Sequence, residues 1–510
     1  MKKSTVVLLV LAGMLLGAAI AIPAMRVTEK NRLLASKYED WLKLSVIMQK
    51  IDEMYVDTVD HEKVTDAAVS AALAALDPHS TYMLPQKLEE TQQDLDASFS
   101  GIGIQFNVPN DTAVVIEVIA GGPAERVGMQ AGDRLLKVGS TDIAGVNFPQ
   151  DSMVRRIKGP TGSKVLVTVS RGGEVIPFEM VRARIPTHSV DAAFMVSDSV
   201  GFIRLSKFAR TTADEFTLAA LNLGAEGARH LIVDLRDNGG GYMDQALKLS
   251  NLFLERGKLI VYMEGRRYPR EESRADGRGP LQNMGLSLLV SEGTASSSEI
   301  FGGAMQDNGR ATLVGRRTFG KGLVQEPVDF RDGSGVRITV ARFYTPSGRC
   351  IQKAYDSYEV DFLNRYAHGE MLAADSMKVE SGGIVPDVFV PIDTTKVGPF
   401  YLNCNRKATS VRFSSDWFDA HKAELQPIDD YNELVQYLDR SDLEKRFLAF
   451  AKNRDGLAPT GDEWEIERPY MLTQVRALIG RYSKLGDNAF YHLYLDTDTV
   501  YKAAVDAIGR

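Results

Sequence analysis

The stretch GLSLLVSEGTASSSEIFGGAMQDNGRATLVGRRTFGKGLVQ, residues 285–325, decides the fold of the middle of the chain. It begins with the apolar run LSLLV, which is short enough to be a buried strand, and a turn signal follows. Ser296 then opens an apolar helical pattern. Further on, Lys321 stands between two glycines, and Gln325 follows four residues later. The order of strand, turn and helix predicts an α/β unit with Ser296 at the carboxyl end of a strand.

The same alternation surrounds this stretch. The runs VGFIRLSKF, HLIVDLR, KLIVYMEG, ATLVG, RITVARFY and DVFVPI are strand-like, and helical patterns separate the first of them. A glycine-rich turn at 237–241 follows HLIVDLR. This order predicts a largely parallel sheet with covering helices, a class in which sites lie at the carboxyl ends of strands. The triple glycine and Ser296 both fall at such ends.

Patterns of other kinds flank this region. Residues 36–95 are mostly helical in spacing, interrupted by a stop and turn at Asp77-Pro78. Residues 99–184 alternate as strands do and include a hairpin signal at 171–173, so they predict a compact strand-rich unit. After about Pro399 the spacing is helical again. No chemistry is visible there, and core packing and self-association are both open.

The composition is that of a folded soluble protein, with 44% hydrophobic and 25% charged residues. A chain of 510 residues predicts two to four domains. The net charge of −7 and the lack of a basic, aromatic-interleaved patch argue against nucleic acid as a partner. Cys350 and Cys404 lack metal-ligand spacing, so no metal is expected, and whether they form a disulfide is open.

The amino terminus indicates export. Lys2-Lys3 precede residues 5–25, an uncharged run rich in Val, Leu, Ala and Ile. Such a run is typical of a cleaved signal peptide or of a retained inner-membrane anchor, since its length is enough to span a bilayer. We therefore expect most of the chain to work outside the cytoplasm, in the periplasm.

Ser296 has two interpretations. With Glu299 three residues on, it matches a capping box, and a serine before a helix is usually a cap. A helix start also presents free N–H groups and a positive dipole end, which a developing oxyanion needs. The N–H of Ser297, with one from Gly240 or Gly241, can supply two donors; of the glycines we choose Gly241.

A nucleophilic hydroxyl needs a base, and none of the seven histidines forms a persuasive triad. Lys321 is the alternative, although a surface turn lysine is the plainer interpretation of its local sequence. To act near neutral pH, its pKa must fall by roughly 3 units, or about 4 kcal/mol, through burial without a counter-ion. Residues 319–324 carry no acid. Gln325 falls on the same side as Lys321, and its amide oxygen can orient the amine without adding charge.

Several stretches agree in order and spacing with one family of proteases. They are YVD (55–57), LDPHSTY (76–82), SGIGI (100–104), GGPAERVGMQAGDRLLKVG (121–139), VDLRDNGGGY (233–242), SEGTASSSEIFGGAMQDNGR (291–310), TFGKGLVQ (318–325), YTPSGRCIQ (344–352) and GIVPDV (383–388). Through them the chain resembles the carboxy-terminal processing, or tail-specific, proteases over residues 36–392. The resemblance gives Ser296 the nucleophile position, Lys321 the base and Gln325 the orienting amide. Gly239 departs from the proline often found in the family.

The resemblance implies an α/β multidomain fold. A crotonase-like α/β hydrolase core would carry an inserted β-rich PDZ domain, a helical N-terminal cap and a helical C-terminal region. The expected boundaries are 1–25 for the signal peptide or anchor, 36–97 for the cap, 98–185 for the PDZ domain, 186–395 for the Ser-Lys protease core and 396–510 for the helical C-terminal domain, with oligomerisation as its candidate role.

The SGIGI stretch predicts a site for peptide tails. Free N–H groups at Gly101, Ile102, Gly103 and Ile104 can face a terminal carboxylate while the following strand takes the peptide as an added strand. A plain turn before an edge strand is the alternative. In the family that the chain resembles, this domain selects substrate tails and can gate access to the serine.

We expect an exported serine endopeptidase that cuts proteins near flexible, apolar carboxyl-terminal tails through an acyl-enzyme, without a cofactor. Its partners would be polypeptides, and inner-membrane anchoring and a homodimer are left open. A catalytically inactive PDZ scaffold is the first alternative, which the joint presence of Ser296, Lys321 and Gln325 disfavours. A lipid or thioester enzyme is the second, which the PDZ-like unit disfavours.

Overall fold

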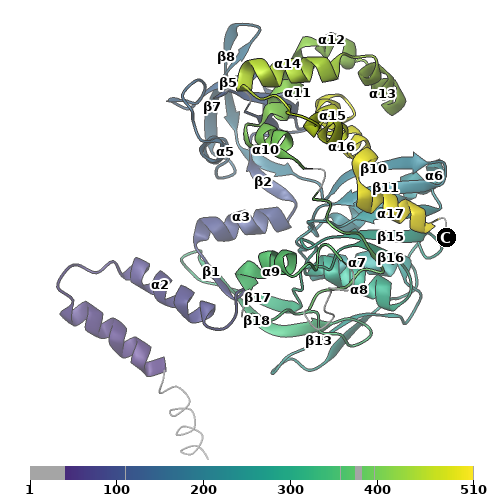
Figure 1. The fold of residues 1–510 in the computed structure, drawn as a ribbon. Helices are drawn as coiled ribbons and strands as arrows, with labels where there is room; N and C mark the ends of the chain where they lie inside the picture. The colour runs from purple at the N-terminus through teal and green to yellow at the C-terminus, as the bar shows by residue number, and fades with distance from the viewer. Residues whose placement is uncertain (1–40, 109–110, 356–357, 374–381, 395–396, 509–510) are drawn as a thin grey trace, which may run out of the picture. The chain divides into compact units, whose positions relative to one another are not determined.

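The computed structural model describes residues 41–108, 111–355, 358–373, 382–394 and 397–508 (Figure 1). The chain divides into two compact units, one ending at Ala75 and the other beginning at Leu76. In the first unit, residues 41–54 are helical and α2 spans His61–Ala74. The proposed signal or anchor segment lies outside the described residues. Within the described part, no helix combines the length and apolar character that a membrane crossing requires.

A six-stranded sheet forms the centre of the second unit. Its strand order is β10-β11-β12-β15-β16-β19, with β10 antiparallel to β11 and the remaining pairs parallel. The bounds are β10 Val190–Ser197, β11 Val200–Leu205, β12 His230–Asp234, β15 Gly285–Val290, β16 Thr312–Gly315 and β19 Val388–Phe389. The predicted parallel sheet is therefore confirmed for four of the six strand-like runs, whereas KLIVYMEG and RITVARFY form β13 (Leu259–Glu264) and β18 (Gly335–Tyr344) of a second, antiparallel sheet. The central strands of the six-stranded sheet are continuous apolar runs because they are covered on both faces.

Helices from the middle of the chain cover one face of this sheet. They are α6 (Thr212–Glu226), α7 (Met243–Phe253) and α8 (Ser297–Asp307). Phe216, Phe253 and Phe301 from these helices pack in one core with Leu231, Val233 and Leu288 of the strands. The core fixes α7 and α8, and with them the two turns that precede these helices.

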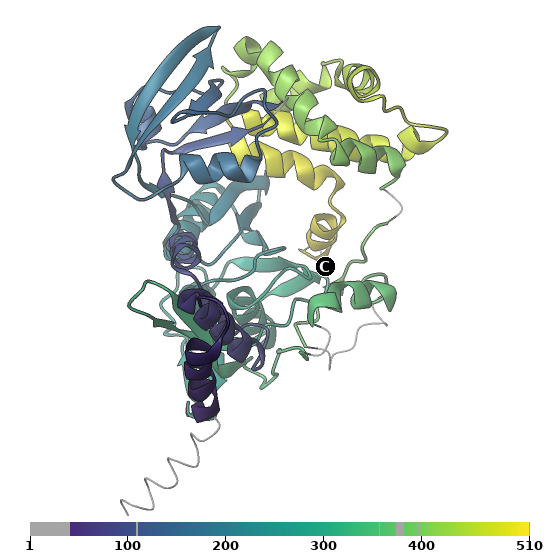
Figure 2. The same ribbon diagram turned by 90° about the vertical axis from the view of Figure 1, so that its left-hand side faces the viewer.

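The other face is covered by the carboxyl-terminal end of the chain. Here α16 (Gly486–Tyr494) and α17 (Thr499–Ile508) lie against the sheet, as the yellow elements in Figures 1 and 2 show. Leu495, Val500 and Ala504 pack against Phe202 and Leu289. The last elements of the chain are therefore part of the core around the central sheet.

A buried ion cluster joins α17 to the end of β12. Arg236 Nη2 lies 2.7 Å from Asp234 Oδ2 and 2.6 Å from Asp498 Oδ2, and Arg204 Nη1 lies 2.9 Å from Asp234 Oδ1. The Asp498 carboxylate also accepts hydrogen bonds from the Val500 and Tyr501 N–H groups at the start of α17. Asp498 thus both caps the last helix and completes the pairing of Arg236.

We expect Asp498→Asn to lower the free energy of unfolding by about 2–3 kcal/mol, since removing one partner of a buried ion pair costs roughly 3–5 kcal/mol and Arg236 is partly exposed. Asparagine keeps the side-chain oxygen that caps α17, so the variant tests the contribution of the negative charge of Asp498. Asp506→Asn, at an exposed position of the same helix, should change stability by less than about 0.5 kcal/mol. Urea midpoints measure both, and equal midpoints would contradict the role of Asp498.

A second, antiparallel sheet carries the segment that follows Lys321. It contains β1 (Thr81–Met83), β18 (Gly335–Tyr344), β13 (Leu259–Glu264), β14 (Glu271–Arg274) and β17 (Leu323–Asp329), with β17 and β18 forming a long hairpin. Nearby are α3 (Pro85–Leu95), the short 3-10 helix Tyr358–Val360 and α9 (Asp361–Ala367). The turn before β1 therefore lies beside the β17–β18 hairpin although some 250 residues separate them in sequence.

Residues between α3 and β10 form the expected strand-rich unit. Its sheet has the order β3-β4-β5-β7-β8 with β6 beside β5, and β2 pairs with β9 where the unit is entered and left. The bounds are β2 Ser98–Gly101, β3 Ile104–Asn107, β4 Ala113–Val118, α4 Pro123–Arg126, β5 Arg134–Val138, β6 Thr141–Asp142, α5 Gln150–Ile157, β7 Lys164–Arg171, β8 Glu174–Val181 and β9 Ala183–Pro186. The predicted hairpin between β7 and β8 is confirmed.

The region after Pro399 is helical, as the spacing predicts. Its helices are α10 (Pro399–Arg406), α11 (Thr409–Ala420), α12 (Lys422–Leu425), α13 (Tyr431–Asp439), α14 (Leu443–Asp455) and α15 (Glu463–Tyr482). They enclose a core of their own around Phe413, Trp417 and Phe447. Cys404 is buried in this core and Cys350 is exposed, and both are free thiols.

Candidate active site

A cleft of about 1010 Å³ lies where β12 and β15 end. Ser296, Lys321 and Gln325 line it, together with Gly241 and Ser297. The residues predicted for catalysis therefore share one cavity, although they come from three turns and from strand β17. Strands β12 and β15 are parallel neighbours, so their carboxyl ends meet at one edge of the sheet. The turns that carry Gly241 and Ser296 therefore lie close together.

Ser296 lies at a strained point of the chain. Its φ of 57° and ψ of −117° are a conformation that a residue with a side chain rarely adopts. The predicted capping box is present, and Glu299 Oε2 accepts a hydrogen bond from the Ser296 N–H at 2.8 Å. The Ser296 hydroxyl faces the Glu299 N–H in this box and donates no hydrogen bond to a described residue, so its proton can be taken by a base in the cleft.

The backbone around Ser296 offers two N–H groups to the cleft. The Gly240 N–H is occupied, since it donates to Asn238 Oδ1 at 2.9 Å. The N–H groups of Gly241 and Ser297 have no acceptor within the described ranges. The Ser297 hydroxyl donates to the Gly241 carbonyl at 2.8 Å and holds the two turns together. This arrangement favours Gly241 over Gly240 as the second oxyanion donor.

Lys321 has the environment that a neutral amine requires. Burial lowers the pKa of its amine, the positive charge of Arg337 lowers it further, and Glu299 and Asp77 oppose the shift. In the described part of the chain, Lys321 Nζ forms no hydrogen bond or ion pair. The amine therefore loses its proton more readily than an exposed lysine, as a general base must.

The fully buried carboxylate of Glu299 joins the serine turn to the lysine loop. Oε2 accepts from the N–H groups of Ser296 (2.8 Å) and Lys321 (2.9 Å), and Oε1 accepts from the Gly320 N–H (2.8 Å) and the Thr318 hydroxyl (2.5 Å). Burial raises the pKa of Glu299, while these four donors oppose the shift. The sequence showed Glu299 as a capping residue, but it gave no sign of the bonds to the lysine loop.

Gln325 makes a contact that the sequence did not predict. A register shift lies where Val324 and Gln325 pair with β18, both residues line the cleft, and Gln325 Nε2 donates to the His79 carbonyl at 2.6 Å. No hydrogen bond joins Gln325 to Lys321. A β-bulge, which produces such a shift, often re-aims a side chain beside an active site. The amide is thus oriented by the turn before β1.

The turn that holds Gln325 is itself held by Asp77. One Asp77 oxygen accepts from the N–H groups of His79 and Ser80, at 2.8 and 2.7 Å. Burial and the charge of Lys321 lower the pKa of His79 to about 4, and its ring contacts Tyr358 instead of entering the cleft. Sequence reasoning placed this turn in the helical lead-in; the LDPHSTY match was the available signal for its role.

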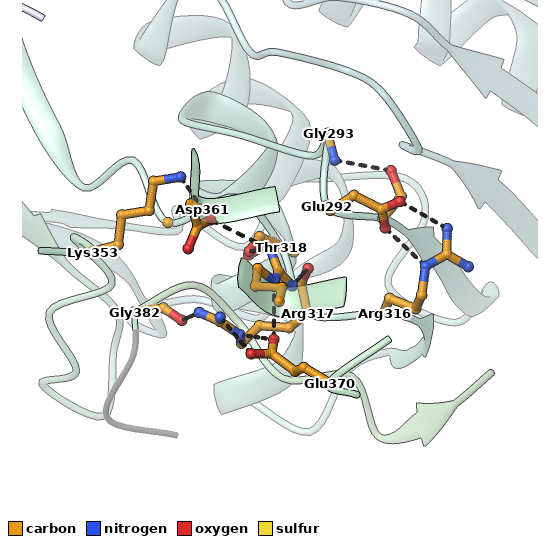
Figure 3. Close-up of polar contacts among 12 residues, drawn as sticks. Glu292, Gly293, Arg316, Arg317, Thr318, Lys353, Asp361, Glu370 and Gly382 are labelled. Atoms are coloured by element: carbon orange, nitrogen blue, oxygen red, sulfur yellow. Dashed lines mark hydrogen bonds and ion pairs between the residues drawn. The ribbon is translucent and has the colours of Figure 1, made fainter. Parts of the chain in front are cut away.

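Buried ion pairs hold the chain just before Lys321 (Figure 3). Arg317 forms a bidentate pair with Glu370, at 2.5 and 3.0 Å, and donates to the Gly382 carbonyl. Arg316 pairs with Glu292 at 2.8 Å. The loop that carries Lys321 is therefore fixed on both sides of the lysine, by these pairs before it and by the β17–β18 hairpin after it.

The predicted tail-binding residues lie in the strand-rich unit. The side chains of Ile102 and Ile104 are buried in its core, so they do not line an open pocket. Gly101 ends β2, and Gly103 has a φ of 79°. The N–H groups of Ile102 and Gly103 have no acceptor within the described residues. Because β3 is an edge strand, these groups stand beside a free strand edge.

Across the described ranges, no group of three or more His, Cys, Asp or Glu side chains is placed to hold a metal ion. His188 also lines the cleft, but it forms no hydrogen bond to Ser296. The polar chemistry around Ser296 is therefore that of Lys321, the backbone N–H groups and the Gln325 amide.

Comparison with known proteins identifies the family. Residues 199–360 match the model of peptidase family S41, and residues 92–170 match that of the PDZ domain. The carboxy-terminal processing protease CtpA of Bacillus subtilis (strain 168) is 34% identical over 313 residues, 61% of this chain and 66% of that protein. A CtpA-like serine protease of Staphylococcus aureus (strain N315) is 31% identical over 371 residues, 72% and 68% of the two chains. The chain belongs to the carboxy-terminal processing proteases of peptidase family S41 and contains a PDZ domain.

Solved structures show related chains. The photosystem II D1 C-terminal processing protease is 27% identical, with a TM-score of 0.39, and covers 69% of this chain and 86% of its own. The PDZ domain of a carboxy-terminal protease from Vibrio cholerae, solved with a peptide, is 32% identical, with a TM-score of 0.16, and covers 17% of this chain and 97% of its own. The family assignment rests on the sequence relatives.

Proposed function

We propose that this protease is a serine endopeptidase that uses Ser296 and Lys321 as a catalytic pair. One observation carries the proposal: a strained serine, whose hydroxyl donates to no described residue, shares a cleft with a lysine whose pKa is lowered by burial. A lone serine at a helix start would be a cap. A neutral amine in the same cavity supplies the base that a nucleophile needs.

The reaction follows from these positions. Ser296 Oγ attacks the peptide carbonyl carbon as Lys321 Nζ takes the hydroxyl proton. The N–H groups of Gly241 and Ser297 donate to the oxyanion, whose charge develops in the transition state. The ammonium of Lys321 then protonates the leaving amine, and an acyl-enzyme remains. Water attacks the ester as Lys321 again takes a proton, which returns to Ser296 Oγ when the new carboxyl terminus leaves. In this proposal the Gln325 amide, oriented by the His79 carbonyl, accepts a hydrogen bond from the amine through its oxygen during the reaction.

The PDZ domain would bring substrate tails to the cleft. The unoccupied N–H groups of Ile102 and Gly103 suit a terminal carboxylate, and the free edge of β3 suits an added strand. Flexible, apolar carboxyl-terminal tails are therefore the proposed substrates. We further propose a crotonase-like core between 186 and 395, a helical cap at 36–97, and export to the periplasm with residues 5–25 as signal or inner-membrane anchor. Homodimer formation through 396–510 completes the proposal.

The test uses the full chain and an unstructured protein that ends in apolar residues. We expect cleavage near the carboxyl end, detected by mass spectrometry, and none with Ser296→Ala. Amidation of the substrate terminus should slow cleavage about tenfold, because it removes a charge-assisted hydrogen bond. Persistent cleavage by Ser296→Ala would overturn the assignment, and absence of cleavage by the unaltered chain would favour an inactive scaffold.

Gly103→Ala should raise KM for the tailed protein about tenfold and leave the cleavage rate of short peptides unchanged. A Cβ at Gly103 would lie 3.2 Å from Ile185 Cδ1 and 3.3 Å from Gly122 Cα, at a positive φ. Gly128→Ala is the matched control, since its φ is also positive but its Cβ would meet nothing within 4 Å. Equal effects of the two variants would contradict tail capture by the SGIGI loop.

A further inference from the structure

The side chain of Arg337 lines the wall of the cleft opposite the serine turn. Arg337 lies on β18, where its Cα pairs with that of Pro327 on β17. Leu323, Gln325 and Pro327 line the same cleft, so this wall is a face of the β17–β18 hairpin. Arg337 is the cation on this hairpin face, which also carries Asp329.

Among the residues that the structure describes, the guanidinium of Arg337 has no counter-ion. It is half-buried, and it forms no hydrogen bond or ion pair with any residue that the structure describes. Asp329 also lines the cleft but is not paired with it. By contrast, Arg210 forms an ion pair with Asp96 at 2.8 Å. Partial burial of a cation without a partner is unfavourable, so Arg337 does not stabilise the fold through an ion pair.

The carboxylates near the lysine are already engaged. Glu299 accepts four hydrogen bonds, and Asp77 accepts those of the turn before β1. Neither leaves its place to neutralise Arg337. Of the other carboxylates that line the cleft, Asp94 binds Lys207, Asp191 accepts from Ser206, and Asp244 and Asp329 do not pair with Arg337. A peptide substrate is therefore a source of an anion for this guanidinium.

We propose that Arg337 is a specificity-determining residue that binds a carboxylate of the peptide substrate inside the catalytic cleft. The proposal rests on the proposed function. A guanidinium suits this task because its planar fork can donate two parallel hydrogen bonds to a carboxylate. The terminal carboxylate of a short tail and an Asp or Glu side chain near the scissile bond share this chemistry.

Binding at Arg337 is coupled to the catalytic base. The groups that act electrostatically on Lys321 are Arg337, which lowers its pKa, and Glu299 and Asp77, which raise it. A substrate carboxylate that pairs with Arg337 would cancel much of the repulsion. The pKa of Lys321 should therefore be lower in the free enzyme than in the complex with a carboxylate substrate. The pH dependence of kcat/KM reports the first and that of kcat the second.

The experiment uses the full chain and a pair of short fluorogenic peptides. One peptide of the pair ends in a free carboxylate and the other in a terminal amide. A second pair differs only in an internal Glu or Gln near the scissile bond. The proteins are the unaltered chain, Arg337→Gln, Arg337→Lys and, as a matched control, Arg331→Gln in the exposed loop of the same hairpin. A Ser296→Ala sample defines background cleavage.

For the unaltered chain, we expect the carboxylate member of one pair to have a kcat/KM about tenfold to a hundredfold higher. The pair that shows the preference identifies the carboxylate as terminal or side-chain. Arg337→Gln should abolish the preference, Arg337→Lys should keep part of it, and Arg331→Gln should keep all of it. In Arg337→Gln, the ascending limb of kcat/KM should move to higher pH for the amide substrate as well, because a positive charge near Lys321 is lost.

Each other outcome decides against the proposal. Equal cleavage of both members of both pairs by the unaltered chain overturns carboxylate recognition and leaves the proposed function intact. A preference that persists in Arg337→Gln assigns the recognition to another part of the chain, such as the PDZ domain. If Arg337→Gln does not fold, the proposal is tested by the preference of the unaltered chain within each substrate pair and by its partial loss in Arg337→Lys. No cleavage above the Ser296→Ala background overturns the proposed function, and this proposal with it.

Discussion

Replacing Lys321 by alanine is expected to lower kcat/KM by about 10⁴-fold, because Ser296 then has no base to take its proton. The fold should survive, since Lys321 Nζ makes no hydrogen bond or ion pair with a described residue. The activity of the unaltered chain should rise with pH through the pKa of Lys321, which lies below that of an ordinary lysine. Below that pKa the amine is protonated and cannot act as the base.

The measurement is initial cleavage rate against pH, with circular dichroism to confirm the fold. His188→Gln is the matched control, because His188 lines the same cleft and is exposed. The double variant Ser296→Ala/Lys321→Ala should be no slower than either single variant, since paired catalytic residues act as a unit. Loss of activity in His188→Gln, with retention in Lys321→Ala, would move the role of base to the histidine.

Glu299→Gln should lower both activity and stability although it changes no volume. All four partners of Glu299 donate hydrogen bonds, and Thr318 Oγ1 already accepts from the Ile384 N–H. Each oxygen of Glu299 accepts from two donors, so the NH₂ group of a glutamine in place of either oxygen would face two donors and accept from neither. We expect a loss of about 2–5 kcal/mol in the free energy of unfolding, since buried donors without acceptors cost about 1–3 kcal/mol each.

Activity in Glu299→Gln should fall about 10²-fold or more, because the same carboxylate sets the distance between the serine turn and the lysine loop. Chemical denaturation and cleavage kinetics measure the two effects. Glu326→Gln, on the exposed side of β17, is the control and should change neither by much. A Glu299→Gln protein with the stability and rate of the unaltered chain would show that the four donors are not held by a charge.

The meeting of the two turns in the candidate site was predictable because it depends on local pattern and on one rule of sheet geometry. Ser296 and Gly241 each follow an apolar strand, and neighbouring parallel strands end at one edge. The sequence therefore indicated that the two turns would meet. Helical spacing likewise predicted the carboxyl-terminal helices, and alternation predicted the β7–β8 hairpin.

The contacts that hold these positions were not predictable, because they join distant parts of the chain. Strict alternation suggested that Gln325 would face Lys321, but the register shift and the His79 carbonyl, 246 residues away, set its amide. Asp498 completes the pairing of Arg236 across 262 residues. No periodicity in a sequence records such pairs, which arise only when the sheets and helices are packed.

The cover of the central sheet by α16 and α17 has a consequence for biosynthesis. Strand β10 begins at Val190, but the helices that bury the second face of its sheet are synthesised after every strand of that sheet. Until they arrive, Phe202 and Leu289 remain open to water and the charge of Arg236 lacks Asp498. A nascent chain therefore carries every catalytic residue before it has a finished core.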